Sequence, residues 1–341
     1  MPNFDDSMRP YQIPYPKIPH IRYYLDHIHY RTPHQHNAFE ILLILDGRVN
    51  ILTDSGNKSF SKNDMLILNT NEIHELSCDE DSVTLLSLQI SPSFCAEYFP
   101  SLRRTIFLQS SISDMLTPEE RVYLSNLLLS SAYCYFTMFG SKRYRVVSLT
   151  AMILDFIESK VPNRQVSIDE SVAFEKKAAR INRIISYIQE HFTEPQLLQK
   201  LARDEKLTST YLSTFFSKNF HISFREYLLR YRLEKAMQLL CTTDLPILDV
   251  CYECGFTDYR QLNRFCNQEY GQSASACRNI ALINRSQPFN PQNAQIIEYL
   301  FSDQEALDYI ASHVKLFPIT LPLGNVTYAL TDEIYNLTLE V

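Results

Sequence analysis

The side chains best suited to recognition chemistry lie on one side of a helical pattern near residue 260. Arg260, Asn263 and Arg264 recur there at a spacing that places them on an outward face, beside Tyr259. Arginine and asparagine side chains can form paired hydrogen bonds with the edges of DNA bases. The pattern therefore indicates an amphipathic helix that presents base-reading side chains to a major groove. Its inward face is apolar and comprises Leu262, Phe265 and Cys266.

A second candidate recognition helix, with shorter polar side chains on its outward face, lies upstream. The expected caps of the two helices, Thr208 and Thr257, are 49 residues apart. Thr208 is expected to cap a helix with apolar inward side chains. A helix with a small polar outward surface fits a groove about 12 Å wide. The outward residues of this helix are Ser209, Thr210, Ser213, Thr214, Ser217 and Lys218.

Each of these helices follows a shorter apolar helix and a tight turn. Glu205-Lys206-Leu207 forms the first turn, and Gly255 forms the second, where a side chain would be costly at positive φ. A long helical pattern over residues 223–243 joins the two copies. Such a helix can hold two recognition helices one DNA turn, about 34 Å, apart. The alternative is an all-helical interaction domain whose outer faces are merely solvated.

The charge distribution favours a phosphate-binding region in the same place. The whole chain has a net charge of −7, but residues 176–285 carry 16 Lys and Arg against 11 Asp and Glu. The windows on either side, 1–175 and 286–341, each have a net charge of −6. A basic region between acidic flanks is the electrostatic pattern expected of a DNA-binding domain.

Three short motifs of the helical region are characteristic in combination. They are the run Arg232-Leu233-Glu234-Lys235-Ala236, the turn Gly255-Phe256-Thr257-Asp258, and Arg264-Phe265 near Tyr270-Gly271. On these residues the region resembles, over about 100 residues, the DNA-binding domain of the AraC/XylS family of transcription regulators. The resemblance implies a domain of seven helices whose third and sixth helices enter successive major grooves of double-stranded DNA.

Four positions depart from the family pattern. An arginine is usual where this chain has Thr214, and a basic residue where it has Ser217. Proline and tyrosine are usual where Ala274 and Cys277 stand. We therefore expect the second recognition helix to supply most of the sequence specificity.

A different chemistry is indicated by the histidines, six of which precede residue 75. His34 and His36 alternate onto one face of a strand, and Glu40 can return to that face. His74 could complete a set of three imidazoles and one carboxylate, which suits Zn, Mn, Fe or Ni. The spacing from His34 through Gly47 resembles the first motif of the cupin superfamily. Phe60 to His74 resembles the second, although Asn63 and Asn69 stand where glycine and proline are usual.

Two interpretations of this set are open. The residues either bind a metal or line a small-molecule pocket, as in the sensor domains joined to this type of DNA-binding domain. We favour a pocket for a sugar or another polar effector, formed by Tyr24, His34, His36, Glu40 and His74. No metal or other cofactor is expected, and these imidazoles and Glu40 are the candidates if a metal is present.

The elements that must position these residues define a multidomain α+β chain. Short apolar runs broken by turn residues, such as Asp46-Gly47, indicate a cupin-like β-barrel. The expected organisation is an N-terminal arm over 1–20, the cupin-like sensor domain over 21–115, a helical dimerisation segment over 116–160, a linker over 161–177, the all-α double helix-turn-helix domain over 178–280, and a small α/β C-terminal extension over 281–341.

The segment between barrel and linker has a clear helix start at Thr117-Pro118-Glu119-Glu120. Its apolar side chains could pair with a second copy or pack on the barrel, and we expect a homodimer. In the C-terminal extension, Ser302 to Glu305 indicates a capping box that opens a helix to about His313. The strands that follow are expected around Leu323-Gly324-Asn325, and the extension should pack on the barrel or the linker.

Cysteine usage and composition indicate a reducing compartment. The eight cysteines form no small secreted framework, and Cys251-x2-Cys254 lacks a second pair of ligands at zinc spacing. We expect both to be buried structural residues. No apolar run is long enough to span a bilayer, and the first residues are acidic and proline-rich, so a cytoplasmic protein is expected.

Three functional hypotheses follow. The first is a sequence-specific, effector-responsive transcription regulator with no enzymatic activity, which binds double-stranded DNA and also contacts RNA polymerase. The rival is a metal-dependent cupin enzyme, such as an isomerase or oxygenase, with a helical appendage. In the third, the barrel serves only as a dimer scaffold.

Overall fold

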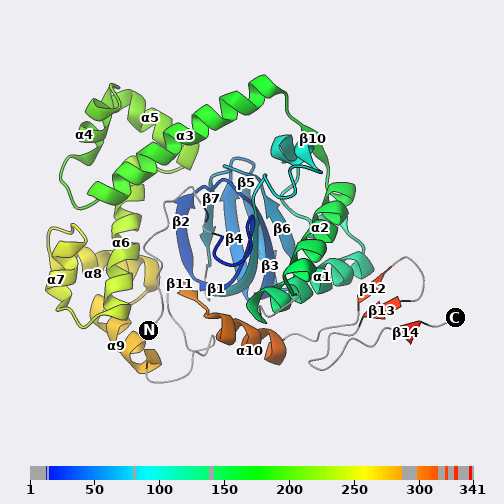
Figure 1. The fold of residues 1–341 in the computed structure, drawn as a ribbon. Coiled ribbons are helices and arrows are strands. Elements are labelled where there is room, and N and C mark those ends of the chain that lie inside the picture. Colours follow the sequence, from blue (N-terminus) through cyan, green and yellow to red (C-terminus); the bar gives the residue numbers. More distant parts are fainter. Residues whose placement is uncertain are drawn as a thin grey trace.

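The computed structural model describes residues 13, 15–79, 82–137, 142–285, 298–313, 319–321, 326–328 and 338–339. Most of the expected N-terminal arm, residues 1–12 and 14, lies outside this part of the chain. A β-domain occupies the centre of Figure 1, with the helices α1 (Pro118–Thr137) and α2 (Lys142–Lys160) on one side and a helical domain on the other. The expected α+β multidomain class is confirmed.

The β-domain consists of two antiparallel sheets. The strand order is β11-β1-β8-β3-β6 in the larger sheet and β2-β7-β4-β5 in the smaller one. The strands are β1 (Ile21–Ile28), β2 (Tyr30–His34), β3 (Phe39–Asp46), β4 (Arg48–Thr53), β5 (Gly56–Ser61), β6 (Met65–Leu68), β7 (His74–Ser77), β8 (Val83–Ile90) and β11 (Glu298–Leu300).

Alternation along the strands divides the buried side chains of the larger sheet between its two faces. On β3, Ile41 and Leu43 pack outward in one core with α1, whereas Leu42 and Ile44 pack inward against the smaller sheet. Both faces of these strands are therefore buried, which explains their nearly continuous apolar sequence. The interior core between the sheets joins residues of both, including Phe60 of β5.

Within the two sheets, the predicted strand runs correspond to β1, β3, β4, β6 and β8, but they left out β11 and three strands of the smaller sheet. The missed strands of the smaller sheet are β2, β5 and β7. Their sequences YRTPH, GNKSFS and HELS are largely polar, and the first two contain proline or glycine. This sheet has exposed positions on one side, so its strands lack the apolar runs of the larger sheet.

Helices α1 and α2 cover the outer face of the larger sheet. Thr117 and Glu120 form the reciprocal cap expected at the start of α1. Leu124, Leu127 and Leu128 are buried in the core shared with the sheet, so these side chains pack on the barrel, which was the alternative to the favoured pairing with a second copy. The connection into α1 contains η1 (Pro100–Arg104), β9 (Thr105–Phe107) and η2 (Ser113–Met115), and β9 pairs with β10 (Asn163–Gln165) after α2.

The helical domain begins earlier than the expected boundary at residue 178. Ser167 and Glu170 form a capping box at the start of α3, which contains residues 168–177 of the expected linker. Within residues 168–285, all described by the structure, seven helices follow one another. They are α3 (Ile168–His191), α4 (Leu197–Asp204), α5 (Ser209–Phe220), α6 (Phe224–Thr242), α7 (Ile247–Glu253), α8 (Tyr259–Tyr270) and α9 (Ala274–Arg285).

The C-terminal extension returns to the barrel. β11 pairs with the end of β1, and Phe301 donates its backbone N–H to the Leu25 carbonyl. Helix α10 (Asp303–His313) begins with the expected capping box of Ser302 and Glu305 and contributes Ile310 to the core beneath α1. The predicted terminal strands are β12 (Ile319–Leu321), β13 (Val326–Tyr328) and β14 (Thr338–Leu339), which form a small sheet.

Among the helices that the structure describes, none combines the length and the apolar character needed to cross a bilayer. Each of the eight cysteines lies in the described part of the chain as a free thiol. Cys251 and Cys254 are buried in the core of the helical domain, in agreement with the expected structural role.

Candidate functional site

The five residues proposed to line the barrel pocket do come together. Tyr24 lies on β1, His34 on β2, Glu40 on β3 and His74 on β7. The prediction that His34 and His36 share one strand is wrong, because β2 ends at His34 and His36 lies in the connection between β2 and β3. The five residues occupy one end of the interior between the two sheets, and Glu40 shares its face of β3 with the inward Leu42. His34 is half-buried and the other four are buried.

Glu40 is the centre of this cluster. Its Oε1 accepts hydrogen bonds from Tyr24 Oη at 2.6 Å, from Ser87 Oγ at 2.5 Å and from Gln89 Nε2 at 3.0 Å. Its Oε2 lies 3.0 Å from His36 Nε2 and 3.4 Å from His74 Nε2. One carboxylate oxygen is thus saturated with donors, while the other faces two imidazoles.

The three imidazoles are oriented by main-chain carbonyls. His34 Nδ1 is 2.9 Å from the Thr32 oxygen, His36 Nδ1 is 3.0 Å from the Ala38 oxygen, and His74 Nδ1 is 2.9 Å from the Glu72 oxygen. Because each Nδ1 donates to a carbonyl, each Nε2 points into the cluster. Ligand atoms of the three rings all lie within 4.8 Å of one another.

The electrostatics of the cluster follow from this packing. Burial acts to raise the pKa of Glu40, but His36 and His74 outweigh it and hold that pKa well below its usual range. Burial, with His74, Arg31 and His36 nearby, keeps the pKa of His34 well below its usual range. Burial and the neighbouring Glu40 raise the pKa of Tyr24. At neutral pH Glu40 is therefore an anion, while Tyr24 and His34 are neutral.

Ser87 and Gln89 belong to this site but were not predicted. They lie on β8, where Tyr24 pairs with Ser87 and Glu40 with Gln89 in register across the sheet. The signal was present in the sequence, because both interrupt the apolar run VTLLSLQI at alternate positions. Polar residues at positions i and i+2 of a buried strand point to the same face. Because burying them without hydrogen bonds is costly, that face must contain other polar groups.

The first recognition helix, α5, has the predicted capping and faces. Thr208 accepts a hydrogen bond from the Tyr211 backbone N–H at 3.1 Å. Leu212 and Phe216 are fully buried, while Phe215 is only partly buried. Among the proposed DNA-binding residues, Thr210, Thr214 and Lys218 are exposed, and Ser209 and Ser213 are half-buried at the edge of the same face.

The second recognition helix, α8, begins one residue later than predicted. Asp258, not Thr257, is its cap, and its carboxylate accepts a hydrogen bond from the Gln261 backbone N–H. The Thr257 hydroxyl instead donates to the Gln261 side chain at 3.1 Å. An aspartate accepts this bond with a full negative charge at the positive end of the helix, which favours it over the threonine.

The outward residues of α8 differ in their exposure and in their hydrogen bonds within the domain. Tyr259, Arg260 and Arg264 are exposed, whereas Asn263 is half-buried. Asn263 Oδ1 accepts a hydrogen bond from the Ala274 backbone N–H at 3.1 Å and so joins α8 to the start of α9. Its side chain therefore has a structural task, which the helical pattern could not reveal.

Helix α6 fixes the two recognition units relative to each other. Arg232 of α6 donates from Nε to the Phe192 carbonyl at 2.7 Å and from Nη2 to the Glu194 carbonyl at 3.3 Å, after α3. Its guanidinium also lies beside the turn at Gly255, where φ is +71°.

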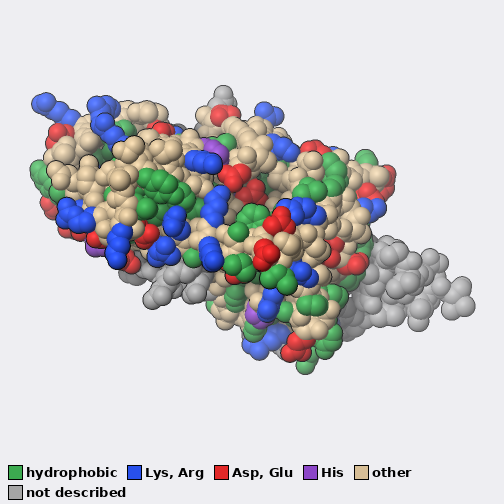
Figure 2. All heavy atoms as spheres, turned by 90° about the horizontal axis from the view of Figure 1, so that it is seen from above, with side chains coloured by type: hydrophobic (Ala, Val, Ile, Leu, Met, Phe, Trp, Pro, Cys, Tyr) green, Lys and Arg blue, Asp and Glu red, His purple; other side chains and the backbone are tan. Residues whose placement is uncertain are grey.

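Lys and Arg side chains are spread over the part of the surface formed by the helical domain (Figure 2).

The barrel contacts the helical domain through β2 and the connection that follows it. Gln35 donates to Asn182 Oδ1 at 2.6 Å and to the Ala178 carbonyl at 3.1 Å, both on α3. The Thr32 hydroxyl donates to Glu234 of α6. None of these contacts was predicted, because they join residues more than 140 positions apart.

Arg230 makes a second set of contacts from α6 to the barrel. Its Nη1 lies 2.5 Å from Glu75 Oε1 on β7 and donates to Tyr30 Oη on β2 at 2.8 Å. The barrel also meets the C-terminal ends of the two recognition helices. His221, the cap of α5, lies 3.0 Å from Asp54, and the ring of Tyr270 in α8 lies 5.8 Å from that of His29.

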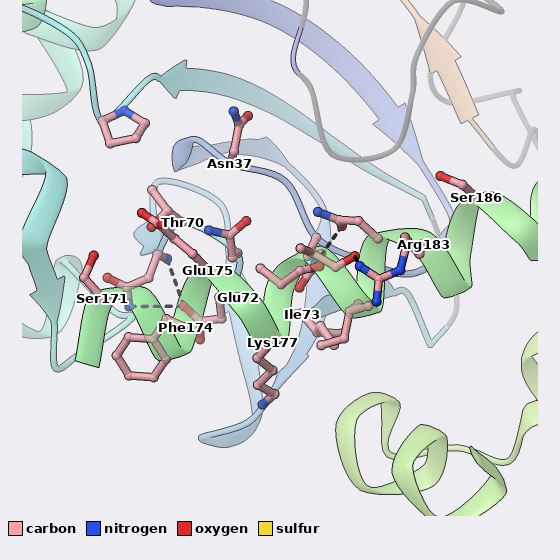
Figure 3. Close-up of a pocket in the computed structure, with 18 of the residues that line it drawn as sticks. Asn37, Thr70, Glu72, Ile73, Ser171, Phe174, Glu175, Lys177, Arg183 and Ser186 are labelled. Carbon is pink, nitrogen blue, oxygen red and sulfur yellow. Dashed lines mark hydrogen bonds between the residues drawn. The ribbon is translucent and has the colours of Figure 1, made fainter. Parts of the chain in front are cut away.

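A cleft of about 1670 Å³ separates α3 from the loops at this end of the barrel. Figure 3 shows Ser171, Glu175 and Lys177 along α3, with Asn37 and Thr70 on the barrel side. Gln35 and Asn182 line the cleft, whereas Glu40 and His74 lie inside the barrel. The cleft is thus bounded by both domains and is distinct from the imidazole cluster.

Two family models match the chain. One, described as an AraC-like ligand binding domain, matches residues 18–123, and the other, described as a helix-turn-helix domain, matches residues 201–280. The first match spans the barrel and the start of α1. The second spans both recognition helices.

Two curated relatives match stretches of this chain of different length. An uncharacterized HTH-type transcriptional regulator of Staphylococcus aureus is 20% identical over 278 residues, which are 80% of this chain and 35% of that protein. The HTH-type transcriptional activator RhaS of an Enterobacter species is 28% identical over 131 residues, 38% of this chain and 46% of that protein. The chain therefore spans less than half the length of these two curated relatives.

Among solved structures, the C-terminal domain of the two-component response regulator yesN from Fusobacterium nucleatum is similar to part of this chain. It is 35% identical, with 29% of this chain and 98% of that domain covered and a TM-score of 0.28.

Proposed function

Because this chain belongs to the AraC/XylS family of transcription regulators, we propose that it regulates transcription by binding specific operator DNA in response to an effector held in its barrel. The proposal is carried by one observation. Helices α5 and α8 each present an exposed polar surface, and both are held in one framework by α6. Two helices so arranged can occupy successive major grooves on one side of a duplex.

The two recognition helices contribute unequally in this proposal. Ser209, Thr210, Ser213 and Thr214 of α5 offer short hydroxyl side chains, with Lys218 directed at phosphate. Helix α8 offers Tyr259, Arg260 and Arg264, whose guanidinium groups can form paired bonds with guanine. Asn263 takes part only through its amide nitrogen, since its oxygen is bonded to Ala274. We infer that α8 supplies most of the specificity.

The effector is proposed to bind at the Tyr24, His34, His36, Glu40 and His74 cluster. The polar groups at this end of the barrel suit a polar ligand, such as a sugar or another small polar metabolite, better than an apolar one. The signal would reach the DNA-binding domain through Gln35, Thr32 and Glu75, which contact α3 and α6. Such coupling requires that the effector binds the docked and undocked arrangements with different affinity.

The remaining partners are also proposals. A homodimer would place two such units on one operator, and the outward surface of α1 and α2 is the proposed contact. RNA polymerase is the expected partner at the promoter, and the cytoplasm is the expected location. Catalysis is not part of this proposal.

Footprinting of the purified chain on genomic DNA, with and without candidate effectors, tests the proposal. We expect protected sites that span two adjacent major-groove segments, and an effector should change their occupancy. Protection without sequence preference would contradict the proposed function. Thermal shifts against a panel of sugars and polar metabolites separate a ligand-binding barrel from one that is only a dimer scaffold.

A further inference from the structure

Two imidazoles face one carboxylate oxygen in the barrel in a way that calls for a cation. His36 and His74 both donate Nδ1–H to main-chain carbonyls, so Nε2 is the ring nitrogen that each directs into the cluster. Both Nε2 atoms face Glu40 Oε2, over 3.0 and 3.4 Å. His74 Nε2 is buried and has no hydrogen-bond partner. A metal ion placed among these atoms would bind both rings and the carboxylate.

We propose that His34, His36 and His74 bind a divalent first-row transition-metal ion through Nε2, with Glu40 as the fourth ligand, and that this ion is the effector of the barrel. This inference rests on the proposed function and assigns a metal ion, in place of a sugar or another polar metabolite, as its effector. It replaces the expectation of a metal-free site that was based on the sequence.

The surroundings of the rings match what a metal site requires. Histidine ligands commonly donate their second ring nitrogen to a carbonyl, which fixes the tautomer and the direction of the lone pair. All three rings do so here. The second oxygen of Glu40 is held by Tyr24, Ser87 and Gln89, so the carboxylate cannot turn away.

The size of the site also favours an ion over a larger ligand. The ligand atoms of the three rings lie within 4.8 Å of one another. Bonds of about 2.1 Å to a tetrahedral ion would bring them to roughly 3.4 Å, a small inward movement. His36, Glu40 and His74 are buried and in mutual contact, so a sugar would have to displace them.

The ion would be coupled to the DNA-binding domain by the chain itself. Gln35, which bonds to α3, lies between His34 and His36. His34 bonds to the carbonyl of Thr32, whose hydroxyl bonds to Glu234 of α6. His74 points into the barrel, and its neighbour Glu75 points outward to Arg230. An ion that draws the three rings together would therefore fix the positions of the barrel residues that contact α3 and α6.

Metal content tests the first part. The full-length chain, treated with chelator and dialysed, is titrated with Zn²⁺, Mn²⁺ or Ni²⁺ and analysed by mass spectrometry of the metal. We expect one ion per chain. His34→Gln, at the least buried of the three rings, should weaken binding by at least about tenfold. His191→Gln, which changes a histidine on α3, is the control and should bind as the wild type does.

Identifying the ligand atoms by spectroscopy of the wild-type chain tests the proposal without relying on the folding of a variant. X-ray absorption of the zinc-loaded wild-type chain should show three imidazole ligands and no sulfur. Sulfur ligands would assign the ion to cysteines such as Cys251 and Cys254 and would overturn the proposal. So would the absence of a stoichiometric ion, or full binding by a folded His34→Gln chain.

Hydrogen exchange tests the coupling without DNA. The ion should slow amide exchange in α3 and α6 at the barrel contacts by at least about fivefold. Gln35→Ala leaves the imidazoles intact, so it should keep the ion and lose most of this protection in α3. An ion that binds without changing exchange in either helix overturns its role as effector. Failure of the chain to bind operator DNA would instead contradict the proposed function, whatever the metal result.

Discussion

Glu75 of β7 and Arg230 of α6 form an ion pair across the boundary between the barrel and the DNA-binding domain, with Oε1 and Nη1 2.5 Å apart. The side chains are 7% and 24% exposed, so water screens the pair only partly. The same guanidinium lies over the ring of Tyr30, with its carbon 5.3 Å from the ring centroid. The pair ties the strand that carries His74 to the helix that joins the two recognition units.

We predict that this pair stabilises the docked arrangement. Glu75→Gln and Arg230→Met should each lower the free energy of unfolding of the docked chain by about 1.5–3 kcal/mol, because each leaves a charged partner without its bond. The double variant should cost less than the sum of the two. Denaturant unfolding of the four proteins measures this coupling.

The control uses the other partner of Arg230. Glu226 lies 2.8 Å from Nη2 on the same helix, four residues earlier, and is 46% exposed. Glu226→Gln should cost no more than about 0.5 kcal/mol, since exposed pairs of this type are screened. Equal costs for Glu75→Gln and Glu226→Gln would mean that the contact between domains contributes nothing of its own.

A second prediction concerns the division between the recognition helices. Arg260→Ala and Arg264→Ala should each weaken operator binding by about 10- to 100-fold, because a paired bond to a base contributes roughly 1–3 kcal/mol. Thr210→Ala and Ser213→Ala should cost less than about fivefold. Electrophoretic mobility shifts at fixed salt concentration measure the four affinities.

Asn263 separates recognition from structure on the same face of α8. Since its oxygen bonds to the Ala274 N–H, Asn263→Ala should lower the stability of the domain as well as its affinity for DNA. Arg260→Ala should leave thermal unfolding unchanged. If the α5 variants cost more affinity than the α8 arginine variants, specificity resides mainly in α5.

The helical domain could be predicted closely because its signals are local. The cap at Thr208, the apolar positions of α5 and the turn at Gly255 all depend on residues a few positions apart. The error at the start of α8, with Thr257 in place of Asp258 as the cap, is a shift by one residue. Local hydrogen bonding alone does not decide between two adjacent capping residues.

The barrel was predictable only in part, for a physical reason. Strands that are buried on both faces consist mostly of apolar residues and are easily recognised. The strands β2, β5 and β7 have polar sequences and give no such signal. The spacing of His34, His36, Glu40 and His74 placed four members of the cluster correctly. The contacts of Gln35 with Asn182 and of Arg230 with Glu75 depend on how two domains meet, and no periodicity encodes that.

A third prediction addresses the proposed dimer. The leucines of α1 are buried against the barrel, so only its outward positions and those of α2 can meet a second copy. Tyr144 of α2 is 83% exposed and is the most prominent apolar side chain of this surface. We expect Tyr144→Glu to convert a dimer to a monomer in sedimentation velocity, whereas Tyr98→Glu, outside these helices, should not. A wild-type chain that sediments as a monomer at high concentration would refute this contact.

A fourth prediction uses the buried thiols. Burial raises the pKa of Cys254 and of Cys266 to about 12. Only the thiolate reacts with iodoacetamide, and a rise of about three units leaves several hundredfold less of it at pH 8.5. Alkylation of both residues in the native chain should therefore be at least about a hundredfold slower than in urea, and it should accelerate as the pH rises. Rapid modification of native Cys254 would show that the turn before Gly255 opens readily.

The last prediction compares two glycines that share a backbone conformation but not a neighbourhood. Gly255 and Gly271 have φ values of +71° and +64°, so alanine at either position costs about 1 kcal/mol of backbone strain. A Cβ at Gly271 would meet nothing within 4 Å, whereas one at Gly255 would lie 2.8 Å from Thr193 Cα and 3.1 Å from the Arg232 guanidinium. Because the backbone at Thr193 can move away only with difficulty, Gly255→Ala should lower the free energy of unfolding by about 1–3 kcal/mol beyond the backbone strain.

The same comparison bears on function, because Arg232 is the side chain that joins α6 to the α3–α4 turn. Gly255→Ala should displace its guanidinium and loosen the two recognition units relative to each other. We therefore expect it to weaken operator binding, while Gly271→Ala loses a little stability and keeps full affinity once folded. Denaturant unfolding and mobility shifts of the two variants measure both effects. Equal losses of stability in the two variants would show that the close approach at Gly255 is relieved without cost and that Arg232 is not fixed by that turn.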